Sequence, residues 1–225
     1  MGLIQKIKKF LLEISGYLIL LVQQIPALGV YVGVMTLPLF IFLVLLFSQL
    51  PPTFIIELAG FFLVSFMSLG GIIANILVIG GLFLAIYSIV YLHRHKNEGL
   101  VTTGPYQYMR HPQYTGFLLF SLGLTGLSCW YLSITFGMGW LPAEATILLW
   151  FGQLAAYIIL ALLEDFHLAK EFGETFTTYK SQVPSLIPFG RTGRLDIPLS
   201  IGIFSLLVLG AIMLQMIGIS GPTFG

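Results

Sequence analysis

Residues 104–116, GPYQYMRHPQYTG, concentrate polar side chains in a chain that is otherwise almost entirely apolar. The stretch holds three tyrosines, an arginine and a histidine, so it offers hydrogen-bond donors, a fixed positive charge and a group that titrates near neutral pH. A second polar stretch, EDFHLAKEFGETFTTYKSQ, follows at 164–182. One interpretation is interfacial anchoring, with Arg110 at the lipid headgroups and the tyrosines in an aromatic belt. The other is that both stretches form one polar site.

Metal chemistry is disfavoured by the number and spacing of the ligand-type residues. His93 and His95 are two positions apart, so on a helix they point to different sides and cannot share a metal ion. Glu164 and His167 have the Glu-x-x-His spacing of di-iron bundles, but the sequence holds no second pair. Four scattered histidines are too few for a membrane desaturase, and Cys129 is the only cysteine. The sequence therefore predicts no metal site.

Motifs for phosphate and nucleic-acid binding are also missing from the sequence. There is no Gly-x-Gly-x-x-Gly after a strand, no Walker sequence and no segment typical of nucleic-acid binding. A transporter or channel is expected to carry charges or broken helices within its spans. Only Glu57 and Glu144 interrupt the long apolar runs, and both lie near the ends of runs.

Composition places the chain in the membrane. Of its 225 residues, 57% are hydrophobic and 8% are charged, and the mean hydropathy is +0.98. The apolar runs are long and repeated, so one anchor or a cleaved signal peptide does not account for them. We predict an all-α, polytopic membrane helix bundle with about seven spans, near 10–25, 27–47, 53–70, 72–92, 113–135, 142–163 and 197–219. Alternatively, 3–22 is an interfacial amphipathic helix and 53–92 is re-entrant.

The distribution of charge predicts the orientation of these spans. All ten Lys and Arg lie at the N-terminus, at 93–111 or at 164–196. With seven spans these three segments share one side, and the positive-inside rule places that side in the cytoplasm.

The stretch 164–182 has helical periodicity of its own. Leu168, Phe172, Phe176 and Tyr179 fall on one stripe, which predicts an amphipathic helix along the membrane surface, interrupted at Gly173. The sequence VPSLIPF at 183–189 then predicts an extended plug, because its two prolines oppose helix.

Taken together, GLVTTGPYQYMRHPQYTG at 99–116 and the stretch from 164 to 188 resemble a family of integral-membrane methyltransferases. This family includes isoprenylcysteine carboxyl methyltransferase and the phospholipid N-methyltransferases. The shared pattern is L-V-T-x-G-x-Y-x-x-x-R-H-P-x-Y-x-G, a hydrophobic hairpin, an acidic pair, and F-G-x-x-[YF]-x-x-Y-x-x-x-V-P-x-x-x-P. Arg-His-Pro alone also occurs in sterol reductases. The first four spans lie outside the resemblance, and the span at 197–219 is a departure from it.

The resemblance implies S-adenosylmethionine as cofactor, bound in a pocket that faces the cytoplasm. It assigns cofactor binding to the backbone of Gly99, Leu100 and Val101, to the pocket residues Tyr106, His111, Pro112, Gln113 and Tyr114, and to the acidic ligand Glu164. Aromatic faces suit a sulfonium by cation-π attraction. The residues implied in catalysis are Arg110, His111 and Glu164, with Arg110 expected to bridge the mouth of the site to the cofactor or to Glu164.

The resemblance also divides the chain into three parts. Residues 1–92 are N-terminal transmembrane helices, 93–190 are the methyltransferase-like region, and 191–225 hold the extra span. The acceptor implied is lipophilic and enters from the bilayer, carrying either a prenylcysteine carboxylate or a lipid head group. An amine acceptor would need Glu164 or His111 as a base. The isoprenylcysteine branch carries an arginine for the substrate carboxylate one turn before the acidic residue, and this chain has Leu160 there.

Two other functions remain open at this stage. One is a reductase-like enzyme that uses NADPH on an apolar double bond, since its relatives share the Arg-His-Pro element. The other is a scaffold or transporter in the membrane whose motif is a remnant, which the leucine at position 160 and the extra span would fit.

Overall fold

The computed structural model describes residues 26–48, 63–95, 99–134, 141–188, 193 and 195–219. The chain divides into two compact units, 1–38 and 39–225. Every regular element in the described part is helical, which confirms the all-α prediction. The elements are α2 (Pro26–Phe47), α4 (Leu69–His95), the 3-10 helix η2 (Gly104–Gln107), α5 (Pro112–Ile134), α6 (Ala143–Phe172), α7 (Glu174–Gln182) and α8 (Asp196–Ile219).

Three of these helices are long and apolar enough to cross a membrane: Leu69–His95, Pro112–Leu132 and Ala143–Phe172. Two shorter apolar segments, Gly33–Phe47 and Asp196–Gly210, overlap the spans predicted at 27–47 and 197–219. The span predicted at 10–25 lies outside the described residues, and so does most of the one predicted at 53–70.

The break before α4 differs from the prediction. The spans predicted at 53–70 and 72–92 place the break at Gly70 and Gly71, but both glycines lie inside α4, and the turn is at Phe66–Ser68 instead. The hydroxyl of Ser68 accepts a hydrogen bond from the backbone N–H of Gly71 at 3.0 Å. A side-chain oxygen that satisfies a free N–H favours the start of a helix, so Ser68 moves the boundary ahead of the glycines.

The end of α6 also differs from the prediction. The span was expected to end at Leu163, but α6 continues without a break to Phe172. Buried positions recur at Tyr157, Ala161 and Asp165, so the inward-facing stripe runs straight into the polar stretch. The predicted interruption at Gly173 is confirmed. Its φ of +55° is a left-handed conformation that glycine adopts at little cost, and α7 starts directly after it.

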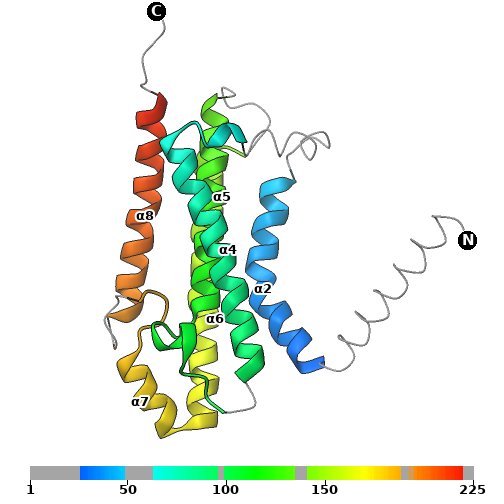
Figure 1. Ribbon diagram of the computed structural model, residues 1–225, viewed down its shortest axis with the longest axis vertical. Coiled ribbons are helices and arrows are strands. Elements are labelled where there is room, and N and C mark those ends of the chain that lie inside the picture. The colour runs from blue at the N-terminus through cyan, green and yellow to red at the C-terminus, as the bar shows by residue number, and fades with distance from the viewer. Residues whose placement is uncertain are drawn as a thin grey trace, which may run out of the picture. The chain divides into compact units, whose positions relative to one another are not determined.

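Within the unit 39–225, α5 is the central helix. It packs against α4, α6 and α8 (Figure 1). In its most apolar window 67% of the helix is buried, compared with 39% for α4 and for α6. The motif residues at the start of α5 are therefore held on the helix that the rest of the bundle surrounds.

Small residues let α4 and α5 approach each other closely. A Cβ added to Gly116 would lie 2.5 Å from the backbone nitrogen of Ala85, and one added to Gly123 would lie 2.6 Å from the carbonyl oxygen of Ala74. Membrane helices associate through such close packing because lipid offers no hydrophobic driving force between them. The contact fixes the end of α4 next to the start of α5.

Gly80 and Gly81 offer a matched test of this contact. A Cβ on Gly81 would lie within 3 Å of backbone atoms of α5, whereas a Cβ on Gly80 would meet nothing within 4 Å. We expect Gly81→Ala to destabilise the protein by about 1–3 kcal/mol, the usual cost of overpacking. Gly80→Ala should cause no loss, since alanine favours helix over glycine. Unfolding of both variants in detergent checks this, and equal stability of the two would contradict the packing.

Candidate functional site

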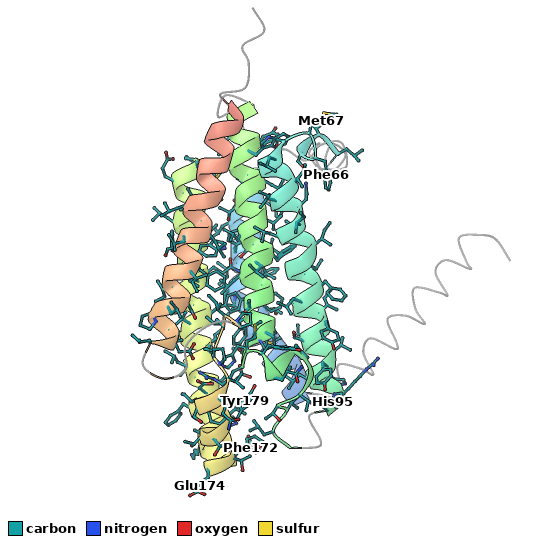
Figure 2. All side chains as sticks on the ribbon, turned by 60° about the vertical axis from the view of Figure 1, so that its left-hand side comes forward. Phe66, Met67, His95, Phe172, Glu174 and Tyr179 are labelled. Carbon is teal, nitrogen blue, oxygen red and sulfur yellow. The ribbon has the colours of Figure 1, made fainter. Side chains whose placement is uncertain are left out.

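The polar segments meet at one end of the bundle. Figure 2 shows Tyr179 and Phe172 at the same end as His95, and Phe66 and Met67 at the opposite end. The loop from 99 to 111, the end of α6, α7 and the start of α8 all contribute to this end. The described parts of 93–111 and 164–196 therefore lie at one end of the bundle, as the sequence predicts.

Arg110 is the centre of the site. The side chain is buried, and its guanidinium group makes a bidentate contact with Asp165, from Nε at 3.2 Å and from Nη2 at 3.0 Å. Nη2 also lies 3.1 Å from Oδ2 of Asp196. Nη1 donates to the backbone carbonyls of Lys180, at 3.3 Å, and Val183. Every nitrogen of this guanidinium is thus bound to protein groups from α6, α7, the plug or α8.

The plug at 183–188 is docked by backbone hydrogen bonds to the same residues. The N–H of Arg110 donates to the carbonyl of Pro184 at 2.8 Å, and the N–H of His111 donates to the carbonyl of Ser185 at 3.0 Å. In turn, the N–H of Ser185 lies 3.0 and 2.9 Å from the two carboxylate oxygens of Asp196. Positions 183–187 are buried and non-helical, as predicted, with bends at Val183, Ser185 and Leu186, while Phe189 of the predicted plug lies outside the described residues. The carbonyls of Pro184 and Ser185 are thus satisfied by the Arg-His segment, and the N–H of Ser185 is satisfied by Asp196.

His111 joins the two acidic residues of α6. Its Nδ1 lies 3.2 Å from Oε2 of Glu164, and its Nε2 lies 3.0 Å from Oδ1 of Asp165. Burial by itself lowers the pKa of His111, but the hydrogen bonds and charges of Asp165 and Glu164 outweigh burial and raise the pKa to about 9. At neutral pH the ring is therefore protonated, and both of its N–H groups donate.

Opposite charges balance in this cluster. Lys180 completes it, with Nζ 3.0 Å from Oδ2 of Asp165. The cluster around Arg110 thus joins three cations to three anions, namely Arg110, His111 and Lys180 with Glu164, Asp165 and Asp196. A buried charge is tolerated only when it is paired and hydrogen-bonded, and each of these groups meets that condition.

Tyr106 and Gln113 form a second polar group beside His111. The hydroxyl of Tyr106 donates to Oε1 of Gln113 at 3.1 Å, with the carbonyl oxygen of Ser88 at 3.3 Å. Burial, assisted by the charge of Glu164, raises the pKa of Tyr106 far above its usual value, so the hydroxyl remains a donor. Nε2 of Gln113 is buried and has no hydrogen-bond partner in the described structure. It is a donor available to a ligand.

The remaining predicted residues lie around these groups. The ring of Tyr114 stacks on that of His111 with centroids 5.4 Å apart, and Pro112 begins α5, where its missing N–H costs nothing. Leu100 packs on the cluster of Phe176, Tyr179 and Val183. Gly99, with a φ of +101°, and Val101 flank Leu100 on the same loop.

Most of the predicted site is thus brought together, but Arg110 has other partners than expected. The sequence predicts a bridge to the cofactor or to Glu164, whereas the structure pairs Arg110 with Asp165 and Asp196. Asp165 was visible only as the second member of the acidic pair. Asp196 had one signal, a lone acid at the start of an apolar run, which in a membrane protein calls for a partner. For Lys180 no pattern in the sequence pointed to the site.

The fold and the site define an integral membrane protein with a buried ionic cluster at one end of its helices. Residues 72–149 match the model of the isoprenylcysteine carboxyl methyltransferase (ICMT) family. The chain is 31% identical over 149 residues to a probable protein-S-isoprenylcysteine O-methyltransferase of Oryza sativa subsp. japonica, covering 64% of this chain and 68% of that protein. It belongs to the isoprenylcysteine carboxyl methyltransferase family.

Other relatives match over shorter stretches. Protein-S-isoprenylcysteine O-methyltransferase B of Arabidopsis thaliana is 31% identical over 103 residues, 45% of each chain. The enzyme of Schizosaccharomyces pombe is 33% identical over 102 residues, 44% of this chain and 37% of that protein. The chain therefore spans about half the length of the Arabidopsis relative. No solved structure matches it.

The raised pKa of His111 predicts a pH-dependent stability. A group whose pKa rises on folding, here from about 6.5 to about 9, stabilises the folded state below the unfolded value and loses this contribution as the pH rises through about 9. The loss is roughly 3 kcal/mol, at about 1.4 kcal/mol per pKa unit. Unfolding in detergent should therefore become easier between pH 6.5 and 9. His111→Gln should be less stable than wild type at pH 6.5 and should lack this decline; parallel pH curves for the two proteins would contradict it.

Proposed function

We propose that this protein transfers a methyl group from S-adenosylmethionine to the carboxylate of a prenylated cysteine that enters from the bilayer. The observation that carries the proposal is the carboxylate of Glu164, held by buried His111 next to Gln113 and Tyr106 in a chain of this family. The names of the relatives supply the acceptor, since they are protein-S-isoprenylcysteine O-methyltransferases.

The residues present fit the cofactor. The cofactor's ammonium group needs a carboxylate partner. The side chain of Glu164 is 16% exposed, so the ammonium can reach its carboxylate. The cofactor's own carboxylate and adenine need donors and a flat surface, which the loop at 99–101, the free Nε2 of Gln113 and the ring of Tyr106 can offer. When bound, the cofactor supplies an electrophilic methyl group on a positively charged sulfur.

With His111 protonated, Glu164 is the one base left of the two named for an amine acceptor. Glu164 is also the group assigned to the cofactor ammonium, so a carboxylate acceptor fits the site better. An amine must lose a proton to a base before or during methylation, while a carboxylate already has a free electron pair. With a pKa of about 9, His111 carries its proton at neutral pH and cannot act as that base. Its role is to hold Glu164 in place. Alignment and exclusion of water then provide the acceleration.

A lipid head group remains the second candidate acceptor, and Leu160 is the observation that favours it. Leu160 lies one turn before Glu164 on α6 and is half-buried, and it offers no charge to a substrate carboxylate. The nearby cations Arg110 and Lys180 are already paired with carboxylates. A prenylcysteine carboxylate must therefore be held by neutral donors or share one of these cations.

The finer topology is part of the same proposal. About seven spans, with the cofactor site facing the cytoplasm, are supported by the clustering of all ten Lys and Arg and by the common end that 93–111 and 164–196 share. The division into 1–92, 93–190 and 191–225 follows from it, with the methyltransferase-like region in the middle.

Cofactor binding is tested by calorimetry with S-adenosylhomocysteine on the purified protein. Glu164→Ala should weaken binding by about 30-fold or more, because removal of one partner of a buried charge pair costs about 2 kcal/mol or more. Glu171→Ala is the matched control, since Glu171 is exposed on the same helix and its ion pair within the described residues is with exposed His167. Unchanged affinity in Glu164→Ala would remove Glu164 from the site. Binding of NADPH in place of S-adenosylhomocysteine would point to the reductase-like alternative.

The acceptor is tested with labelled S-adenosylmethionine and protein in lipid vesicles. A prenylated cysteine with a free carboxylate should become labelled, and the same compound supplied as its methyl ester should not. Label in the vesicle lipids instead would establish the head-group alternative. No transfer and no cofactor binding would favour the scaffold or transporter.

A further inference from the structure

The start of α8 contributes a buried acid to the site, although the proposed function gives it no role. Asp196 is the first residue of α8 and is only 3% exposed. It lies beyond residues 72–149, which carry the match to the family model. Its carboxylate accepts hydrogen bonds from Nη2 of Arg110 at 3.1 Å and from the N–H of Ser185 at 2.9 Å. Since α8 packs against α4 and α5, the bundle holds this carboxylate in place.

The position of Asp196 affects how the positive charges around the other aspartate, Asp165, are shared. The carboxylate of Asp165 pairs with three cations, Arg110, His111 and Lys180. Two of these three cations have a second carboxylate partner: the guanidinium of Arg110 also pairs with Asp196, and the imidazole of His111 also pairs with Glu164. With the charge of Arg110 shared in this way, Oδ1 of Asp165 remains oriented toward Nε2 of His111, and the other ring nitrogen holds Glu164.

A continuous series of contacts therefore leads from α8 to the group assigned to the cofactor. It runs from Asp196 through Arg110, Asp165 and His111 to Glu164, with every step between 3.0 and 3.2 Å. A second path is shorter: Asp196 binds the N–H of Ser185, and the carbonyl of Ser185 accepts the N–H of His111. The first path reaches Glu164 through the imidazole of His111, and the second ends on the backbone N–H of the same residue.

We propose that Asp196 is a positioning residue for the cofactor site, so that helix α8 contributes to cofactor binding. By sharing the charge of Arg110 and binding the plug at Ser185, it keeps His111 oriented and Glu164 in the geometry that receives the cofactor. The inference rests on the proposed function, because Glu164 is a cofactor ligand only within it.

Removal of the charge at Asp196 should weaken cofactor binding as well as lower the stability of the fold, because it leaves a buried charge uncompensated. Asp196→Asn keeps the shape and an oxygen that can accept the N–H of Ser185. It leaves the cluster with an uncompensated positive charge, so Arg110 draws Asp165 away from His111. Residues that orient a ligand through another side chain typically affect affinity by about 10- to 100-fold, as known for metal sites. We expect the Kd for S-adenosylhomocysteine to rise within this range.

The experiment uses the full chain in detergent and measures Kd for S-adenosylhomocysteine and the melting temperature for each variant. The set is Asp196→Asn, Asp196→Glu and the control Ser200→Ala. Ser200 is buried one turn further along α8, and its hydroxyl donates to the backbone carbonyl of Asp196 at 2.9 Å. Ser200→Ala should bind within about twofold of wild type. Asp196→Glu restores the charge and should recover most of the affinity lost in Asp196→Asn.

Methyl-transfer kinetics separate positioning from a general loss of structure. In Asp196→Asn the KM for S-adenosylmethionine should rise about as much as the Kd does, while the KM for the acceptor stays within about twofold. Wild-type affinity in folded Asp196→Asn would overturn the inference. So would folded Asp196→Glu with affinity reduced tenfold or more, and this second variant decides the matter if Asp196→Asn does not fold. Absence of binding by the wild-type chain would instead contradict the proposed function itself.

Discussion

A buried arginine held by two carboxylates organises this end of the protein. Arg110 cannot lose its charge, so its burial requires partners that α6 and α8 supply as Asp165 and Asp196. Breaking a buried pair leaves an uncompensated charge and costs several kcal/mol, so these helix ends are held in register with the loop that carries Arg110. The plug, His111 and Glu164 then take positions relative to this pair. The arrangement of the site therefore follows from the need to pair the buried guanidinium of Arg110 with carboxylates and carbonyl groups.

The helices were largely predictable because membrane helices are encoded locally. A run of about twenty apolar residues is enough to predict a span, and the interruption at Gly173 and the stripe of Leu168, Phe172, Phe176 and Tyr179 follow from periodicity. The structure joins these four residues in one cluster with Val183 and Leu100. Two boundaries were wrong for a common reason. At Gly70 and at Leu163 composition changes, but a cap at Ser68 and a continuing buried stripe on α6 decide where the helices start and end.

The partners of Arg110 could not be predicted, because they depend on tertiary structure. Asp165 and Asp196 are 55 and 86 residues from Arg110 along the chain, and no periodicity relates residues so far apart. A motif places a residue within a site without naming its contacts. The sequence therefore predicted the residues around the site, including Tyr106, His111 and Gln113, and missed the acid on α8 that balances its charge.

The neutrality of the cluster has a consequence for the proposed reaction. Methyl transfer from a sulfonium to a carboxylate consumes one positive and one negative charge, so the transition state carries less charge than the reactants. Such a reaction is favoured when water is excluded, because water stabilises the separated charges more than the transition state. A site with net charge would favour one reactant and repel the other. Because three cations are matched by three anions, the described cluster can bind the cofactor through Glu164 and still leave a carboxylate acceptor without a large net repulsion. Asp196 makes that balance complete, which ties the charge of the site to the presence of α8.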